Sequence, residues 1–282
     1  MLQKQIGIPA CFSSGEKLSD DPSTITRSGQ NVLMSIYRTK IADEFRLITI
    51  TWCKNLLLHG LSVSVEGPEG ESQYTCKVDL KPWYFWKKQG SKRFFVDDKP
   101  VDVFWDLKSA KFSGETEPSS NHYVAVVCDN EVALLLGNLK KEAYRKTGCR
   151  PSLFDPVLVS RKEHIFGKKK FITRFKFQDK GSFHEIFIEC KNGNGVDPEM
   201  EIRMDGHLVI LVKHLQWKFR GNESICLNKA RIEVYWDVHD WLFSPGLRHA
   251  FFVFKPSTLL SSSSPLTTVS DFCLFLYAWK VE

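Results

Sequence analysis

Hydrophobic and polar residues alternate with a period of two along much of the chain. The segment HGLSVSVEG places Leu61, Val63 and Val65 on one face and serines on the other, and VDVFWD, EIFIEC and KFITRF alternate in the same way. Alternation of this kind predicts β-strands with one face toward a core. Gly, Pro, Asn and Asp cluster between the short runs, as in antiparallel sandwiches and barrels. The pattern therefore predicts an all-β fold.

One unusual hexapeptide pattern, VDVFWD and IEVYWD, occurs twice. The two copies are 131 residues apart, and the match at this offset covers residues 86–106 and 217–237 without a gap. Upstream, an offset of 125 relates VLMSIYRTKI, from Val32, to VLVSRKEHIF, from Val157. The offset changes within KNGNGVDPEM (191–200), whose turn residues predict a surface loop. Two matching blocks around one insertion predict a tandem duplication, with a period too long for solenoid or propeller repeats.

One segment, NLKKEAYRKTG, has the features of a helix. The side chain of Asn138 is expected to cap its start, Leu139 and Ala143 are expected to face inward, and Gly148 to end it. A barrel of the pleckstrin-homology type would need a helix after both copies. The second copy ends instead in DFCLFLYAWKVE, which predicts a strand, so antiparallel β-sandwiches fit better, with one composite sheet structure as the alternative.

The helix lies between the two copies and therefore marks the domain boundary. We expect a flexible N-terminal tail (1–25), a first β domain ending in the short helix (26–150), and a second β domain (151–282) that duplicates the first. Each domain is predicted to contain roughly eight strands in sandwich-like sheets. The Ser-rich stretch at 256–270 predicts a loop.

The aligned copies share tryptophans and an aspartate. Because a duplicated domain keeps what its fold requires, we expect the tryptophans to fill each core, and the aspartates to accept hydrogen bonds at strand ends. A shared role in contacting a ligand is the alternative. The structural core residues predicted in this way are Trp86, Trp105, Asp106, Trp217, Trp236 and Asp237. The alignment also places Cys190 and Cys226 on Val65 and Phe95, which predicts buried free thiols in hydrophobic positions.

Composition points to an ordinary globular protein, with 43% hydrophobic and 26% charged residues. The N-terminal MLQKQIGIPACFSSGEK does not resemble a secretory signal, and the most apolar run, FCLFLYAW, is far shorter than the roughly 20 residues of a membrane helix. We therefore expect an intracellular protein, cytoplasmic or nuclear and not secreted, with no transmembrane segment.

Positive charge is concentrated in one stretch. Residues 139–176 contain twelve Lys and Arg against Glu142, Asp155 and Glu163, a net charge of +9 in a chain whose total is +6. The first copy has ADEF where the second has GKKK, so the duplicated fold does not require this charge. Such a surface could contact an acidic protein, anionic lipid or nucleic-acid phosphate, or it could simply be solvated. The candidate binding residues are Lys140, Lys141, Arg145, Lys146, Arg161, Lys162, Lys168, Lys169, Lys170, Arg174 and Lys176.

Motifs for catalysis or cofactor binding are missing from the sequence. There is no GxGxxG, GxxxxGK[ST], GxSxG or HExxH, so we predict no catalytic residue, no cofactor and no metal. Asp237, His239 and Asp240 in WDVHDWLF have the side chains of metal ligands, but strand geometry directs residue 240 away from the other two. A polar turn is therefore the better interpretation. A DNA-reading helix and an RNA-stacking motif are also missing, so sequence-specific nucleic-acid binding is not expected.

Several strings together resemble a known plant family, the one defined by domain of unknown function 868. They are IGIPACFSS, LLLGNLKKEAYRKTGCRP, LVSRKEHIFGKKKF, LQWKFRGNESI and VYWDVHDWLF, and they extend over nearly the whole chain. The resemblance implies a plant origin and carries no established activity or catalytic residue.

The sequence thus predicts a non-enzymatic, intracellular binding or scaffold protein whose basic surface, at about residues 139–176, contacts an unknown acidic protein or anionic surface. One alternative is a peripheral membrane or lipid-phosphate binder that uses the same residues. Another is a small-molecule or enzymatic cleft between the copies, near His239 and Asp240.

Overall fold

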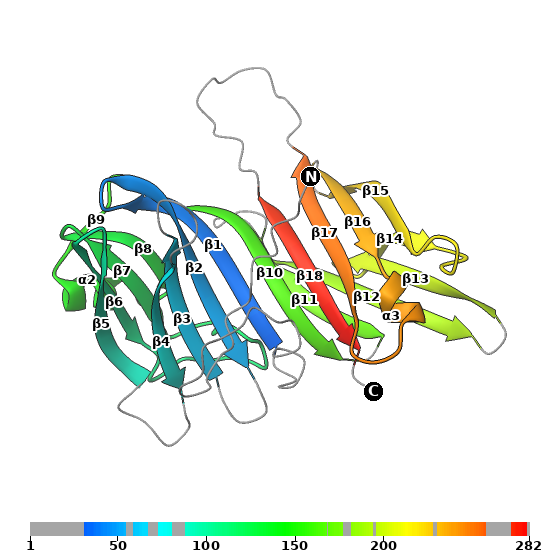
Figure 1. Cartoon of the computed structure of the whole chain (residues 1–282), viewed down its shortest axis with the longest axis horizontal. Coiled ribbons are helices and arrows are strands. Elements are labelled where there is room, and N and C mark those ends of the chain that lie inside the picture. The colour runs from blue at the N-terminus through cyan, green and yellow to red at the C-terminus, as the bar shows by residue number, and fades with distance from the viewer. Residues whose placement is uncertain are drawn as a thin grey trace. The chain divides into compact units, whose positions relative to one another are not determined.

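The described part of the chain folds mostly into β-strands, with the two short helices α2 and α3, which confirms the all-β class (Figure 1). The computed structural model describes residues 31–54, 59–66, 73–80, 88–167, 169–176, 182–193, 196–227, 230–257 and 272–280. The predicted tail at 1–25 and most of the Ser-rich loop at 256–270 lie outside these residues. The chain divides into two compact units, unit 1 up to Val157 and unit 2 from Leu158.

The described residues of unit 1 form nine strands and one helix. Their bounds are β1 Asn31–Ile41, β2 Glu44–Lys54, β3 His59–Glu66, β4 Gln73–Leu80, β5 Gln89–Val96, β6 Lys99–Asp106, β7 Tyr123–Cys128, β8 Glu131–Gly137, α2 Lys140–Thr147 and β9 Arg150–Pro151. Strands β1 to β4 pair in sequence order, all antiparallel. Strands β5 to β8 form a second antiparallel series, which β9 extends in parallel beside β8.

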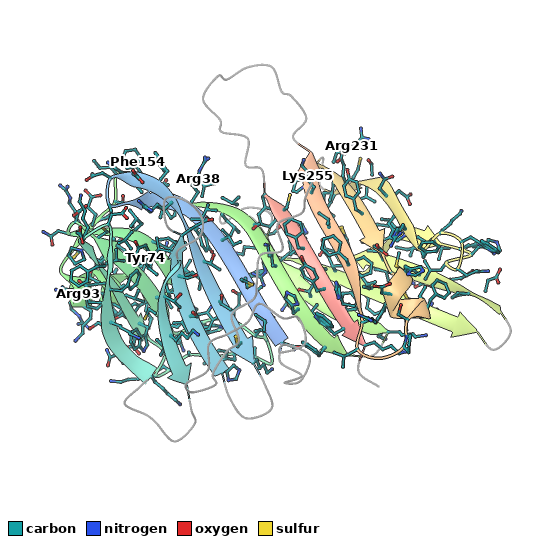
Figure 2. All side chains as sticks on the ribbon, viewed as in Figure 1. Arg38, Tyr74, Arg93, Phe154, Arg231 and Lys255 are labelled. Carbon is teal, nitrogen blue, oxygen red and sulfur yellow. The ribbon has the colours of Figure 1, made fainter. Side chains whose placement is uncertain are left out.

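Period-two alternation decides burial on β6, whereas β3 and β7 are buried on both faces, Ser62 and Ser64 included. On β6, Val101, Val103 and Trp105 are buried, while the residues between them are partly exposed. Each fully buried aliphatic side chain stabilises a fold by about 1.5–3 kcal/mol relative to exposure. Toward solvent, Arg93 on β5 projects from the sheet and forms an ion pair with Asp102 on β6 (Figure 2).

The helix α2 confirms one predicted element and corrects its start. Ala143 is fully buried against β7 and β8, Leu139 packs on the same cluster, and Gly148 ends the helix in the left-handed conformation, with φ 67°. The predicted cap is wrong, because the N-cap is Leu139 and no side chain caps it. Asn138 Oδ1 instead accepts a hydrogen bond from the backbone N–H of His122 at 3.3 Å, which fastens the chain entering the helix to the start of β7.

Unit 2 also contains nine strands and one helix. Their bounds are β10 Val157–Gly167, β11 Lys170–Phe175, β12 His184–Gly193, β13 Val196–Met204, β14 His207–Val212, β15 Arg220–Leu227, β16 Ala230–Asp237, α3 His239–Phe243, β17 His249–Ser257 and β18 Cys273–Lys280. Strands β11 to β14 form one antiparallel sheet. Strands β15 to β18 are antiparallel in order, and β10 pairs in parallel with β18. The strand predicted at the end of the second copy is therefore confirmed as β18.

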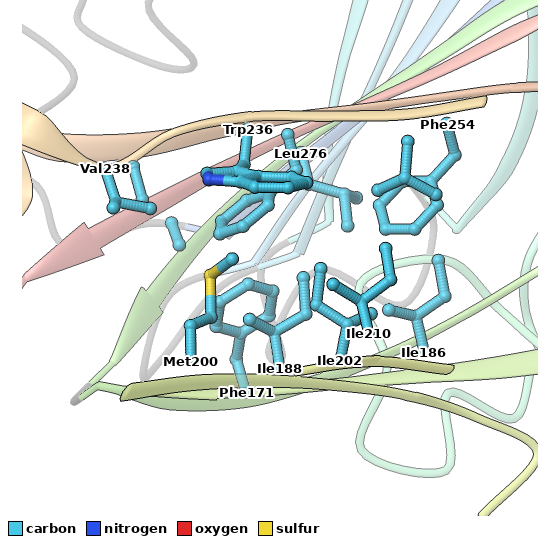
Figure 3. Packing of buried hydrophobic residues seen from close by; sticks show 14 of the residues in the cluster. Phe171, Ile186, Ile188, Met200, Ile202, Ile210, Trp236, Val238, Phe254 and Leu276 are labelled. Carbon is cyan, nitrogen blue, oxygen red and sulfur yellow. The ribbon is translucent and has the colours of Figure 1, made fainter. Parts of the chain in front are cut away.

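The core of unit 2 lies between these two sheets (Figure 3). Trp236, Phe254 and Leu276 project from the sheet that contains β16 to β18, and Met200 and Ile202 face them from β13. All five are at most 8% exposed. Two sheets that bury one face each against the other form a sandwich, which is the predicted architecture.

The two units resemble each other in part of their topology. Strands β5 to β8 and β15 to β18 are both four-stranded antiparallel meanders, but β1 pairs with β2 whereas β10 pairs with β18. The loop predicted at 191–200 is largely wrong, because β12 and β13 extend through it and Gly193 lies opposite Val196. Backbone pairing overrode the local turn preference there. The tandem duplication therefore stays a prediction.

Candidate functional site

The basic residues on α2 lie in unit 1 and form an exposed group. Lys140, Lys141, Arg145 and Lys146 are all exposed, because Ala143 occupies the buried face of the helix. Among the described residues, no ion pair to any of the four is found. Arg145 and Lys146 lie in the last turn, where the negative end of the helix dipole favours cations. We call these four residues the α2 cluster.

The remaining basic residues belong to unit 2, so the residues of the predicted surface are divided between the two units. Lys170 and Arg174 are exposed on β11, on the same face as Ile172, which is 53% exposed. Lys169 precedes the strand and Lys176 follows it, each partly buried. Lys168 lies outside the described residues. We call Lys169, Lys170, Arg174 and Lys176 the β11 cluster.

Aromatic rings and a carboxylate hold the β11 cluster in place. Lys170 Nζ lies 5.1 Å from the ring centre of Phe187, and Lys176 Nζ lies 4.4 Å from that of Phe183. Cation–π contacts of this kind contribute about 0.5–1 kcal/mol at exposed sites. Arg174 Nε approaches Glu185 at 4.0 Å. The β11 cluster is thus partly neutralised and positioned by its own sheet.

Two predicted binding residues on β10 are less accessible than expected. Lys162 is partly buried, with Nζ 5.8 Å from the ring centre of Phe275, and burial lowers the pKa of its ammonium group. The guanidinium Nη2 of Arg161 donates to the carbonyl of Arg174 at 3.3 Å. Both side chains therefore lie along strands of unit 2 and are less available to a partner than the α2 cluster.

The repeated Trp–Asp pair has a structural role in both units. Trp105 lies opposite Gly90, and a Cβ at Gly90 would come within 2.9 Å of the indole. Asp106 Oδ1 accepts the backbone N–H of Lys108 at 3.1 Å. The Leu107 N–H donates to the Lys88 carbonyl at 2.7 Å, joining the end of β6 to the start of β5.

Unit 2 repeats the glycine opposite the indole, the aspartate hydrogen bond and the backbone bond between the two strands. Trp236 lies opposite Gly221, and its Nε1 donates to the carbonyl of Lys218 at 3.0 Å. Asp237 Oδ1 accepts the N–H of His239 at 3.1 Å, and Val238 N–H donates to the Phe219 carbonyl at 2.9 Å. Trp105 and Trp236 are each 8% exposed. These contacts explain why the Trp–Asp pair occurs in both units, and they involve no ligand.

One predicted core tryptophan is on the surface. Trp217 is 81% exposed, because it occupies the turn between β14 and β15, where the side chain of Leu215 is buried instead. Its aligned counterpart, Trp86, lies outside the described residues. The prediction for Cys226 is also wrong: both Cys226 and its counterpart Phe95 are exposed. Cys190 is buried as expected, and burial raises the pKa of its thiol to about 12.

The His239–Asp240 segment is a short helix, α3, where a polar turn was predicted. His239 Nδ1 lies 2.9 Å from Asp240 Oδ1, and this contact lowers the pKa of the Asp240 carboxyl. The His239 ring packs against Phe219 at 4.9 Å and Phe243 at 5.4 Å. Trp241 is fully buried and anchors the helix. In the described part of the chain, no group of three or more His, Cys, Asp or Glu side chains is arranged to hold a metal ion.

An ion-pair network that sequence reasoning missed joins the hairpin turns of unit 1. Lys99 pairs with Asp43 and, at 3.2 Å, with Asp129, while the buried guanidinium of Arg46 pairs with Glu44 at 2.7 Å and with Asp97. The only signal in the sequence was an acidic residue at each turn, which is ordinary turn chemistry. The acidic turn of unit 1 is thus neutralised internally, whereas the aligned segment of unit 2 is basic.

Comparison with known proteins identifies one family. A family model described as plant protein of unknown function (DUF868) matches residues 28–280, which is nearly the whole chain. A search of curated proteins gives no match. Neither described helix has the length and apolarity to span a bilayer.

Proposed function

The chain belongs to the DUF868 family of plant proteins of unknown function, and we propose that it is an intracellular, non-enzymatic binding protein whose basic surface contacts an acidic partner. The observation that carries this proposal is the α2 cluster: four exposed cations on one helix for which no ion pair is found among the described residues. Uncompensated charge of one sign raises the local concentration of oppositely charged partners and directs their approach.

Some cations of unit 1 already have acidic partners, whereas the α2 cluster gathers four cations without one on a single helix. Arg93 pairs with Asp102 at 2.7 Å, and Arg150 pairs with Glu131 at 2.6 Å. An acidic partner that approached these side chains would have to compete with an existing carboxylate. At α2 it would meet cations without breaking an internal pair. Because one exposed ion pair contributes only about 0–1 kcal/mol, several neighbouring cations are needed for useful affinity.

The β11 cluster supports a second, smaller contact. Its side chains are held over Phe187 and Phe183, so their conformational entropy is already reduced before a partner binds. Ile172 lies exposed between Lys170 and Arg174 and offers an apolar contact within the charged strand. This combination favours an acidic protein surface with some apolar content over a simple polyanion.

The absence of catalysis is part of the proposal and is supported by how the polar groups are used. Asp106 and Asp237 accept backbone hydrogen bonds, and the imidazole of His239 pairs with Asp240 while packing on phenylalanines. We also infer that the two units descend from one duplicated domain. The identical Gly–Trp–Asp contacts support this, and the basic residues would then be later additions at positions where the copies differ.

The experiment compares matched charge-neutralised variants in binding to poly-glutamate. The α2 variant carries Lys141→Gln, Arg145→Gln and Lys146→Gln, and its control in the same unit carries Lys77→Gln, Lys108→Gln and Lys111→Gln, which are also exposed. We expect the α2 variant to bind roughly tenfold more weakly than the wild type, and the control to change by less than about twofold.

A β11 variant with Lys169→Gln, Lys170→Gln and Arg174→Gln completes the set. Affinity purification from plant extract, with wild type and α2 variant side by side, would then identify the protein partner by mass spectrometry. If the α2 and β11 variants both retain wild-type binding to poly-glutamate and to every captured protein, the basic surface is not a binding site and the proposal fails.

A further inference from the structure

Trp217 is presented at a fixed position on the surface of unit 2. It is 81% exposed, yet the turn that carries it is well anchored. The side chain of Leu215 is fully buried, and the Leu215 N–H donates to the Pro198 carbonyl at 2.8 Å. His214 Nδ1 lies 2.6 Å from Asp197 Oδ2, and the Trp217 N–H donates to the His214 carbonyl at 2.9 Å. A tryptophan with little core contact is thus held out from the fold by a rigid turn.

Further exposed apolar side chains lie beside this turn. Phe219, two residues after Trp217, packs edge-to-face on Phe243 with 6.1 Å between ring centres. Phe243 at the end of α3 is 50% exposed, and Leu247 in the following loop is 38% exposed. Scattered exposed apolar residues are normal, but a tryptophan next to an exposed phenylalanine forms an apolar patch at one end of the unit.

Charged side chains of both signs lie beside this turn. Arg220 pairs with Asp237 at 2.7 Å, while Asp197 and Asp240 contact His214 and His239, whose rings carry charge only when protonated. Lys213 and Lys218, on either side of Trp217, are exposed, and no ion pair to either is found in the described residues. Two lysines available to an anionic surface therefore flank Trp217.

We propose that this surface, the Trp217 tip, inserts into the interface of an anionic membrane. We define the tip as Lys213, Trp217, Lys218 and Phe243. An indole ring favours the boundary between headgroups and acyl chains, and lysine stems extend along apolar surface while their ammonium groups meet lipid phosphates. Because Trp217 protrudes, it suits a fluid surface that opens around it. A protein partner would need a preformed pocket for the ring.

This inference does not depend on the proposed function, because the tip shares no residue with the α2 or β11 clusters. A peripheral protein of this kind would bind a membrane through the tip and an acidic partner through other residues. The two contacts can therefore be lost independently, and the experiment uses variants that separate them.

The test measures co-sedimentation of the full chain with vesicles. One set contains phosphatidylcholine alone, and the other contains about 30% phosphatidylserine, which gives a negative surface potential. We expect binding to the anionic vesicles only. Trp217→Ala should weaken this binding roughly tenfold, and the pair Lys213→Gln and Lys218→Gln about 30-fold.

Two controls keep the outcome interpretable. Phe95→Ala removes a comparably exposed aromatic ring from unit 1 and should leave vesicle binding unchanged. Unchanged circular dichroism and melting of Trp217→Ala would show that the fold is intact. The proposal is overturned if the wild type does not bind anionic vesicles, or if the α2 variant abolishes vesicle binding while the tip variants retain it. It is equally overturned if Trp217→Ala abolishes capture of a soluble protein without changing vesicle binding.

Discussion

Replacing Gly221 with alanine tests whether the repeated glycine is required by the indole that lies opposite it. Gly221 and Trp236 face each other across β15 and β16, and Trp236 is buried with its Nε1 bonded to the Lys218 carbonyl. A Cβ at position 221 would meet Cζ2 of the indole, with Cε2 at 2.8 Å and Cη2 at 3.0 Å. These atoms belong to a rigid ring packed in the core, so the strand or the ring must move.

The magnitude follows from two opposing effects. Overpacking a core position costs about 1–3 kcal/mol. Replacing glycine by alanine at an unstrained position favours the folded state by about 0.4–1 kcal/mol, because the unfolded chain loses freedom. We expect Gly221→Ala to lower the free energy of unfolding by roughly 1–2 kcal/mol. Gly90→Ala should cost less, because the nearest indole atom of Trp105 would be 2.9 Å away.

Urea denaturation followed by circular dichroism measures this effect as a shift in the midpoint at constant m value. For a unit of this size, the shift should be roughly 0.5–1 M, and hydrogen exchange should locate it in β15 and β16. The steric reasoning also predicts a double-mutant result: in a Trp236→Phe background, where the clashing ring atoms are gone, Gly221→Ala should cost little. An equal cost in both backgrounds would refute the packing explanation.

Three further predictions concern titratable groups. Lys99 lowers the pKa of Asp43, so this pair stabilises the fold above the ordinary carboxyl pKa of about 3.9 and ceases to do so as the pH falls. In urea unfolding, Asp43→Asn should therefore be less stable than the wild type at about pH 7 and equal to it at about pH 2. Burial lowers the pKa of His164 from 6.5 to about 3, so below about pH 6.5 the unfolded chain binds a proton that the folded chain excludes. Stability should then fall by up to roughly 1.4 kcal/mol per pH unit toward pH 4, and an unchanged slope in His164→Gln would contradict this. Iodoacetamide should alkylate the exposed Cys226 in the native protein, and it should alkylate the buried Cys190, whose thiol pKa is about 12, only after unfolding. Equal alkylation rates of the two cysteines in the folded protein, measured by mass spectrometry, would disprove this.

Much of the fold was predictable because strand periodicity is a local property. Alternation in VDVFWD placed Val101, Val103 and Trp105 on one face, and all three are buried. The helix was predicted from its turn residues, and Gly148 does end it. Two local preferences were misleading. Asn138 bonds to the start of β7 instead of capping the helix, and the turn-rich 191–200 segment pairs as strands. Asn138 found a partner 16 residues away in sequence, which no local pattern encodes. The 191–200 segment pairs across its own hairpin, so strand pairing reaches further toward the turn than its composition suggests.

The candidate surfaces were less predictable, because charge in a sequence does not specify position in space. Residues 139–176 are contiguous in the sequence, yet they divide between α2 of unit 1 and β10 and β11 of unit 2. Trp217 was misjudged for a related reason. Its alignment with Trp86 suggested a shared core role, but exposure depends on which residue of a turn faces inward, and in this turn it is Leu215.

Sequence-aligned positions that differ in charge between the two units are the best places to look for function. The Gly–Trp–Asp contacts are the same in both units, as expected for groups that any copy of the fold needs. At the positions that the sequence aligns, however, Asp43 in the β1–β2 hairpin of unit 1 is paired with Lys99, whereas unit 2 carries Lys169 and Lys170 between β10 and β11, which belong to different sheets, with Lys170 over Phe187. An internally neutralised turn serves stability in unit 1, whereas Lys169 and Lys170 of unit 2 form no ion pair among the described residues. Positive charge that is not used in an internal pair is available to a partner outside the fold. By this reasoning, neutralising Lys169 and Lys170 should leave the melting temperature within about 2 °C of wild type while reducing poly-glutamate binding, and a large loss of stability would assign these lysines to the fold instead.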